Sequence, residues 1–501
     1  MLVISYIMKV NRGNCRIFSK IISGGIPKEK GMDVKFMKRV AVIGGGITGL
    51  STMFYLQKLK QENNLDIELA LIDSSEQLGG KIRTVKCADY KMETGADSMV
   101  VTKENVMPLI EALGLQNEVV YNATGISYLF VNDELLPIPE DTVFGIPTNE
   151  QALFASQLIS ESGKLRALED YNSRNTTFTS ESSIGDFLEF FLGEEIVEKQ
   201  IAPVLSGVYS GNLHDLSIAS TLPYLLDYKN EYGSILKGLE INQSKFKSNS
   251  NKKFISFKGG LGTLIEALEN ALTDVRIFKG IATTNITKHG EEYVVELSSG
   301  GSLVADTVVV STSHQIAQQL LNDERLNPLF NQFLNSSLTS VYLGFDIPDS
   351  ELPADGTGFI VSSNGNLLCN ASTWSSRKWP HTSVNGNLLV RLFYKSSIPS
   401  YSELDTLSEE EVVEIALKDI EKSLGFMKKP AVVEVTKWND LMPNYTLQHP
   451  EAVASLRKEM ACLYPEVILA GCSYDGVGIG ACITNGKETA EAIAEKWVVI
   501  K

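Results

Sequence analysis

The chain has 501 residues, of which 43% are hydrophobic and 21% charged, as in ordinary globular proteins rather than disordered or fibrous ones. At roughly 150 residues per domain, this length predicts about three domain-sized units. The 45 basic and 61 acidic residues give a net charge of −16, which repels phosphate backbones and argues against nucleic-acid binding. No run approaches about eighteen apolar residues, so we expect no transmembrane segment, although peripheral membrane contact stays open.

The six cysteines and five histidines are scattered along the chain, and no two cysteines have Cys-x-x-Cys spacing. Zinc and iron sites need clustered ligands, so we expect no metal site and no disulfide framework, as suits a reducing cytoplasm. Residues 1–36 differ from the rest because they are basic and free of acids up to Lys28. A targeting leader, a disordered tail, or a start assigned too early with Met37 as the true beginning would each explain this, and we favour the last two over the leader.

The first predicted unit begins at residues 39–43, a short apolar run typical of a buried parallel strand. A glycine-rich turn follows at 44–49, and apolar residues then recur on one face of a predicted helix over 47–60. Residues 68–72 read as a second strand that stops at Asp73. The order predicts a strand–helix–strand unit with its glycine-rich turn where the first strand ends.

The remaining elements follow from the same kinds of pattern. Further strands are predicted over residues 275–278, 293–297, 307–310, 338–345, 358–362, 387–393 and 466–470. Helices are predicted over residues 183–198, 407–424 and 481–497. We expect the strands between 338 and 393 to form an antiparallel sheet.

The turn after the first strand carries Gly44, Gly46 and Gly49 in Gly-x-Gly-x-x-Gly spacing. The first glycine permits the tight turn, the second lets a pyrophosphate approach the backbone, and the third lets helix and strand pack closely. Asp73, 24 residues beyond Gly49, can accept hydrogen bonds from ribose hydroxyls. The sequence therefore predicts a dinucleotide site.

Three further glycine-rich stretches favour a flavin dinucleotide over a nicotinamide one. Residues 78–81 and 93–98 offer backbone amides beyond the ribose, and 476–479 opens another helix after the last strand. Such amides suit a pyrophosphate and an isoalloxazine ring, which a nicotinamide enzyme does not need to hold.

These residues carry a resemblance that extends from Lys38 to the C-terminus. The chain resembles the porphyrinogen oxidases of the flavin-containing amine oxidase superfamily, in particular the Gram-positive coproporphyrinogen III oxidase type. The motifs that carry the likeness are Gly44–Gly49, Gly79-Gly80-Lys81, Gly95-Ala96-Asp97-Ser98, Leu205 to Gly211, Gly259-Gly260-Leu261, Gly356 to Phe359, Lys378-Trp379-Pro380-His381, Trp438 with Met442-Pro443-x-Tyr445, and Gly476 to Ile479.

The resemblance implies FAD bound noncovalently. Contacts to it are implied at Gly44, Gly45, Gly46, Ile47, Thr48, Gly49, Asp73, Ser74, Lys81, Gly95, Ala96, Asp97, Ser98, Thr283, Trp438, Val477, Gly478 and Ile479. Thr283 is implied near the adenine, and Trp438 and 477–479 near the flavin ring. The expected fold is α/β: a discontinuous Rossmann-like FAD-binding domain with a mixed-sheet substrate domain and a helical domain. The predicted boundaries are 37–103, 250–315 and 432–501 for the FAD domain, 104–249 for the helical domain and 316–431 for the mixed sheet.

The implied reaction is the oxygen-dependent, six-electron oxidation of coproporphyrinogen III to coproporphyrin III in haem biosynthesis, with three H₂O₂ released. Protoporphyrinogen IX is the alternative substrate. The resemblance also implies a cytoplasmic protein, with transient contact to the next haem-pathway enzyme. Two rivals remain: another flavin oxidase, such as an amine oxidase or a carotenoid desaturase, and a flavoprotein that has kept the fold without turnover.

The substrate side needs an apolar surface and cations for propionates. Lys103, shortly after the 95–98 turn, is the candidate catalytic residue, as a charged contact or proton acceptor, or else a solvated surface lysine. Trp379 and Tyr445 either wall the macrocycle or pack the core. Arg391 on an apolar strand needs a partner, either a propionate or an internal carboxylate. His381 is interpreted as structural.

Overall fold

The computed structural model describes residues 37–101, 103–123, 126–139, 141–208, 212–247, 254–352, 356–362, 365–398 and 401–498. The leader or late start expected at 1–36 lies outside these residues. Lys38–Lys501 forms one compact unit. Among the described residues, no helix combines the length and the apolar character needed to cross a membrane.

A five-stranded parallel sheet has the strand order β12-β2-β1-β16-β22. Its strands are β1 (Lys38–Ile43), β2 (Ile67–Ile72), β12 (Arg276–Phe278), β16 (Thr307–Val310) and β22 (Val467–Leu469). All five correspond to predicted strands. They come from three separate stretches of the chain, so the sheet is discontinuous in sequence, as the resemblance implied. The α/β architecture with a Rossmann-like sheet is confirmed.

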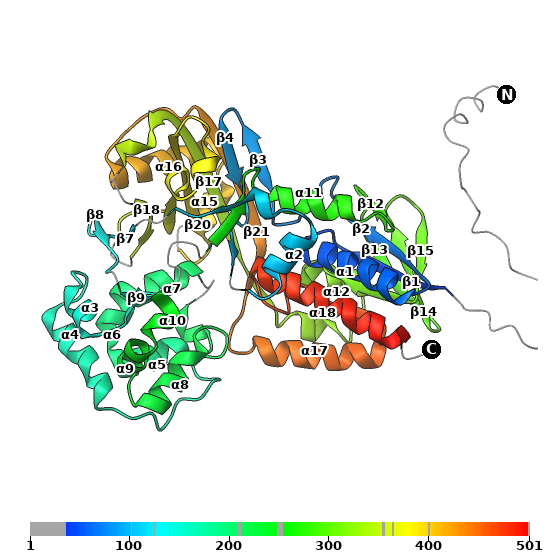
Figure 1. The fold of residues 1–501 in the computed structure, drawn as a ribbon, viewed down its shortest axis with the longest axis horizontal. Coiled ribbons are helices and arrows are strands. Elements are labelled where there is room, and N and C mark those ends of the chain that lie inside the picture. Colours follow the sequence, from blue (N-terminus) through cyan, green and yellow to red (C-terminus); the bar gives the residue numbers. More distant parts are fainter. Residues whose placement is uncertain are drawn as a thin grey trace, which may run out of the picture. The chain divides into compact units, whose positions relative to one another are not determined.

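Both faces of this sheet are covered, as a parallel sheet requires. Alternate residues such as Val40 and Val42 face α1 (Ile47–Asn63), α11 (Gly262–Ala271) and α18 (Ile479–Val498). The first and last of these helices pack side by side (Figure 1). The residues between them, such as Ala41, contact the other layer. That layer consists of α12 (His314–Leu321), α17 (His449–Leu463) and the antiparallel strands β13 (Thr283–His289), β14 (Glu292–Leu297) and β15 (Ser302–Ala305).

A second, seven-stranded sheet has the order β21-β17-β20-β19-β18-β7-β8. Its strands are β7 (Ile126–Val131), β8 (Glu134–Pro137), β17 (Leu334–Pro348), β18 (Gly356–Val361), β19 (Ala371–Trp374), β20 (Asn387–Lys395) and β21 (Val432–Asn444). The antiparallel pairing predicted between 338 and 393 is correct, but the sheet also contains β7, which was not predicted and runs parallel to β18. The sheet is therefore mixed.

The second sheet takes strands from outside the segment expected to supply it. Strand β21 pairs with β17 although 432–501 was predicted for the FAD domain, and β7 and β8 come from the segment predicted to be helical. One face packs on α15 (Tyr401–Thr406) and α16 (Glu409–Leu424), forming a core of side chains such as Val341, Leu392 and Tyr394. The domain boundaries themselves remain a prediction.

A helical part follows between β8 and β11, with its own core. Its helices are α3 (Glu150–Ala155), α4 (Glu161–Leu168), α5 (Ile184–Leu192), α6 (Glu194–Ile196), α7 (Ala202–Val208), α8 (Pro223–Tyr232), α9 (Ile235–Ile241) and α10 (Gln243–Lys247). The helix predicted over 183–198 is interrupted at Gly193, whose φ of 96° lies outside the helical region. A π-helical turn at Val197–Ile201 then leads into α7.

Short elements connect these parts. They are β3 (Thr84–Cys87), β4 (Tyr90–Glu93), β5 (Met99–Val100), β6 (Val119–Tyr121), β9 (Thr142–Val143), β10 (Ile146–Pro147), β11 (Phe254–Phe257), α2 (Val106–Ala112), α13 (Asn327–Phe330) and α14 (Ser375–Lys378). The hairpin β3–β4 leads directly into residues 94–98, one of the glycine-rich stretches of the site.

Candidate active site

The glycine-rich turn between β1 and α1 has the geometry its spacing predicts. Gly44 has a φ of 106°, which L side chains rarely adopt. A Cβ at Gly49 would collide with the Gly44 carbonyl oxygen, so only glycine lets α1 pack this closely on the strand. Gly46 is the N-cap of α1, without a capping side chain, and a Cβ built on it would meet no atom within 4 Å.

The adenine-side residues gather beside this turn. Asp73 accepts hydrogen bonds from the backbone N–H of Gly45 at 2.6 Å and of Ser75 at 2.7 Å. Its own carbonyl accepts from Ile281 at 3.1 Å, which brings the start of β13 alongside. Thr283 in that strand has a buried hydroxyl oxygen with no hydrogen-bond partner in the described part of the chain. The structure therefore places Thr283 and Asp73 in one neighbourhood, as an adenosine contact requires; Ser74 is exposed there.

The second glycine-rich stretch lies directly against the first. Gly79 donates from its N–H to the Gly45 carbonyl at 2.9 Å, and a Cβ on Gly80 would be 3.4 Å from the Gly46 Cα. Lys81 then reaches the C-terminal stretch, where its Nζ is 3.3 Å from the Cys472 Sγ. Three segments far apart in sequence thus meet at the carboxyl ends of β1 and β22.

The loop at 94–98 is held from three sides. The Ala96 N–H donates to the Lys81 carbonyl at 3.1 Å, and a Cβ on Gly95 would collide with that same oxygen. The Trp438 indole N–H donates to the Thr94 carbonyl at 2.9 Å. Arg391, 1% exposed, donates to the carbonyls of Thr94 and Gly95 at 2.9 Å each.

Arg391 thus has partners other than the two expected. Its Nε donates to the Ser340 hydroxyl at 2.7 Å, and its guanidinium lies 4.4 Å from the Phe393 ring centroid. Carbonyl and hydroxyl oxygens, rather than a carboxylate, satisfy the guanidinium donors. Arg391 therefore positions the 94–98 loop from the second sheet, a role that sequence reasoning missed.

Two carboxyl groups, Asp97 in this loop and Glu93 just before it, have pKa values shifted in opposite directions. Although burial opposes it, the nearby Lys378 and Arg391 hold the pKa of Asp97 well below its usual range, and Lys378 forms an ion pair with it at 3.0 Å. Burial raises the pKa of Glu93 to about 7. Glu93 accepts hydrogen bonds from the Leu261 N–H at 2.8 Å and the Thr84 hydroxyl at 3.0 Å. Nothing in the spacing of the sequence marked Glu93.

The C-terminal stretch ends at the N-terminus of α18. The Tyr445 hydroxyl accepts from the Gly476 N–H at 2.6 Å and donates to the Cys472 carbonyl at 2.7 Å, which braces this turn. A Cβ on Gly478 would meet no atom within 4 Å. Val477 is exposed, and Ile479 begins the helix.

The candidate Lys103 is brought to this turn. A Cβ on Gly480 would be 2.7 Å from the Lys103 Cβ, so the lysine stem lies beside the first turn of α18. The Lys103 side chain is exposed. Trp379 is 3% exposed and packs edge-on against His381, whose pKa burial lowers to about 4. Tyr445 stacks on His449 with ring centroids 3.8 Å apart. Trp379 therefore serves packing, as does the imidazole of His381, whereas Tyr445 remains partly exposed.

The arrangement fits a dinucleotide cofactor. Gly46 and Gly478 have no neighbouring atom where a side chain would stand, and each lies at the N-terminus of a helix, where free amides and the helix dipole favour an anion. The Thr283 hydroxyl, which has no partner among the described residues, and the half-exposed Asp73 carboxylate lie where the resemblance predicts the adenosine end. Glycines that leave room for a pyrophosphate, together with a solvent-accessible carboxylate and an unpaired hydroxyl, suit a bound FAD. Within the described residues, no three His, Cys, Asp or Glu side chains gather into a metal-binding group.

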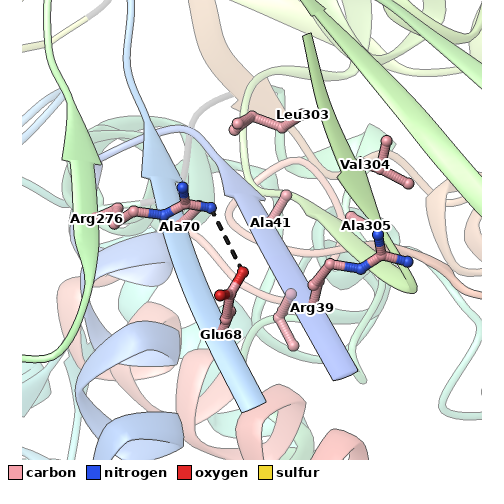
Figure 2. A pocket seen from close by; sticks show the side chains of 9 residues that line it. Arg39, Ala41, Glu68, Ala70, Arg276, Leu303, Val304 and Ala305 are labelled. Carbon is pink, nitrogen blue, oxygen red and sulfur yellow. Dashed lines mark ion pairs between the residues drawn. The ribbon is translucent and has the colours of Figure 1, made fainter. Parts of the chain in front are cut away.

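Figure 2 shows a pocket at the opposite end of the five-stranded sheet. Arg39, Glu68 and Arg276, which line it, stand near the starts of their strands, and the last two form an ion pair at 3.8 Å. Its volume of about 10 Å³ admits about one water molecule. Since ligands of such sheets bind beyond the carboxyl ends of the strands, this pocket is not the cofactor site.

Comparisons with known proteins identify the family. The sequence pattern of the flavin-containing amine oxidoreductases matches residues 47–494. The chain belongs to this family. It is 35% identical to the coproporphyrinogen III oxidase of Bacillus subtilis, over 90% of this chain and 96% of the relative. It is 31% identical to the coproporphyrinogen III oxidase of Staphylococcus aureus, over 91% of this chain and 99% of the relative.

The solved structures agree. A protein from Exiguobacterium assigned as a protoporphyrinogen oxidase has a TM-score of 0.83 and 31% identity, covering 93% of this chain and all of that one. A UDP-galactopyranose mutase, with a TM-score of 0.69 and 12% identity over 92% of this chain and 96% of the other, shares the fold. The chain is therefore an FAD-dependent oxidoreductase, as predicted.

Proposed function

We propose that this enzyme oxidises coproporphyrinogen III to coproporphyrin III, with molecular oxygen as the acceptor, as a step of haem synthesis. The observation that carries the proposal is the 35% identity to a coproporphyrinogen III oxidase over nearly the full length of both chains. Six hydrogen atoms leave the macrocycle and three O₂ become three H₂O₂, so atoms and electrons balance. FAD, when bound, accepts two electrons per cycle.

The chain itself contributes binding and orientation. The amide groups at Gly46 and Gly478 would hold the cofactor, with Asp73 and Thr283 at its adenosine end and Lys81, Trp438 and the 95–98 loop nearer the flavin ring. Arg391 and Trp438 fix the loop on which Gly95 and Asp97 stand. Phe393, half-exposed beside Arg391, offers an apolar surface for the macrocycle.

Protoporphyrinogen IX is the second candidate substrate, because the Exiguobacterium protein of known structure is assigned to that reaction. The purified enzyme in air should convert both porphyrinogens with growth of porphyrin fluorescence, and the tetrapropionate faster. Peroxide should appear at three molecules per porphyrin. A faster rate with the dipropionate would instead make protoporphyrinogen IX the substrate and place the enzyme at that later step of haem synthesis. Oxidation of amines but of neither porphyrinogen would overturn the proposal.

Lys103 is proposed as a charged contact or proton acceptor beside the flavin-ring motif, since its stem lies against Gly480. A Lys103→Met variant should then lose turnover or raise KM, whereas Lys86→Met, in the exposed part of β3, should not. Equal activity of the two variants would make Lys103 a surface residue. A cytoplasmic location and transient contact with the next haem-pathway enzyme complete the proposal.

A further inference from the structure

Strand β20 has two unlike faces. Leu392 and Tyr394 point into the core beneath α16 and are fully buried. Arg391, Phe393 and Lys395 alternate with them and therefore share the opposite face. Arg391 is the residue that holds the 94–98 loop, so this second face is the one turned toward the cofactor loop.

The same face continues across the neighbouring strands. Leu338 of β17 stands opposite Lys395 on one side and Trp438 of β21 on the other. Trp438 also contacts the 94–98 loop. Side chains on this face, including Phe393, Lys395 and Ala371, are half-exposed, in contrast to the closed core on the other face. The face carries apolar side chains such as Leu338, Phe393 and Trp438 together with polar ones such as Ser340 and Thr436, and the cation Lys395 lies at its end.

Lys395 is a partly buried cation that is not paired with an acid in the described part of the chain. Its Nζ donates to the Ser206 carbonyl at 2.7 Å, near the end of α7, and no carboxylate of the described residues lies within ion-pair distance. Burial lowers the pKa of Lys395 to about 8, with no charged neighbour opposing it. By contrast, the buried Lys229 forms an ion pair with Asp170 at 2.7 Å. Buried charges are ordinarily paired, so the ammonium of Lys395 is a candidate partner for an anion from outside the chain.

The spacing suits the substrate. Lys395 is four residues beyond Arg391, or about 13 Å along an extended strand. A macrocycle lying on Phe393 with one edge toward the 94–98 loop would extend a carboxylate side chain to this distance. Across the sheet, Lys395 and Trp438 are two strands apart, or about 10 Å.

We infer that Lys395 binds a propionate carboxylate of the porphyrinogen at the end of this face remote from the 94–98 loop. The inference rests on the proposed function and goes beyond it, because it assigns a specificity-determining cation. A lysine that only capped the end of α7 would change stability without distinguishing charged from neutral ligands.

The chain provides a matched control. Lys437 of β21 lies on the opposite face of the same sheet and also donates to carbonyls, those of Asp405 at 2.7 Å and Leu407 at 3.0 Å. The FAD-loaded wild type, Lys395→Met, Lys395→Arg and Lys437→Met are each titrated with coproporphyrin III and with its tetramethyl ester. KM for coproporphyrinogen III is measured in parallel.

Lys395→Met should weaken coproporphyrin III binding and raise KM by about tenfold, the worth of one charge-assisted hydrogen bond. Ester binding should be unchanged, Lys395→Arg should stay within about threefold of wild type, and Lys437→Met should match it. The inference would be overturned if Lys395→Met bound coproporphyrin III as tightly as the wild type, or if it lost equal affinity for the acid and for the ester. Turnover by the wild type would support the proposed function in either case. If the wild type oxidised neither porphyrinogen, both would fail.

Discussion

Replacing Gly46 by valine separates cofactor binding from folding. The φ and ψ of Gly46, −71° and 177°, are extended values that valine adopts readily, and no atom lies within 4 Å of the added Cβ. The apoprotein should therefore unfold within about 1 kcal/mol of the wild type. The side chain would occupy the space through which a pyrophosphate reaches the amides at the start of α1.

Each hydrogen bond to a charged group is worth about 1.5–3 kcal/mol. Losing two of them should weaken FAD binding by at least about a hundredfold, since about 1.4 kcal/mol corresponds to tenfold. Purified Gly46→Val should be colourless, and titration of the apoprotein with FAD, followed by quenching of flavin fluorescence, gives Kd. Gly301→Val is the matched control, because Gly301 lies in the distant β14–β15 turn with equal space around its Cβ. A yellow Gly46→Val protein with a Kd within threefold of wild type would refute this account of the turn.

Three further changes test the surroundings of the site. Arg391→Met removes three hydrogen bonds from a buried position and should lower the free energy of unfolding by about 3 kcal/mol, with Arg391→Lys intermediate in urea titrations; no loss would contradict the positioning role. Burial raises the pKa of Glu93 to about 7 from 4.5, so the folded chain binds more protons than the unfolded chain between these pH values. The free energy of unfolding should therefore fall by up to about 3 kcal/mol as the pH rises through this range. The melting temperature should fall with pH over the same range, and Glu93→Gln should reduce this fall. If the slope of melting temperature against pH were unchanged in the variant, Glu93 would not be its source. Because burial lowers the pKa of Lys395 to about 8, the wild-type KM should rise above that pH as the cation is lost, and a Lys395→Met profile with the same rise would assign it to another group.

The nucleotide-binding half of the fold was predictable because its signals are local. Apolar runs bounded by glycine or aspartate predicted all five strands of the parallel sheet, and residues 307–310 match β16 to the residue. Strand β21 was missed because charged and polar residues interrupt its thirteen positions, with Pro443 near its end. Its pairing with β17 outweighs that weak pattern, since main-chain hydrogen bonds do not depend on apolar alternation.

The contacts that assemble the site are long-range, which is why spacing did not reveal them. Lys81 and Cys472 are 391 residues apart, and Arg391 and Thr94 are 297 apart. The sequence showed that a charged residue on an apolar strand needs a partner, but not that main-chain carbonyls would provide it. The single helix predicted over 183–198 is wrong at Gly193, which has a positive φ. A Cβ at Gly193 would meet the Arg166 side chain, a long-range contact that the helical pattern does not show.

The second sheet does more than cover the cofactor domain. Trp438 from β21 and Arg391 from β20 donate to one carbonyl, that of Thr94, so two strands fix a single point of the 94–98 loop. The same strand β20 continues to Lys395. A rigid strand that holds the cofactor loop at one end and a cation at the other fixes the distance between them. Since binding energy is useful only when the reacting parts are aligned, that fixed distance is how a fold shared with other oxidoreductases could select a polycarboxylate macrocycle.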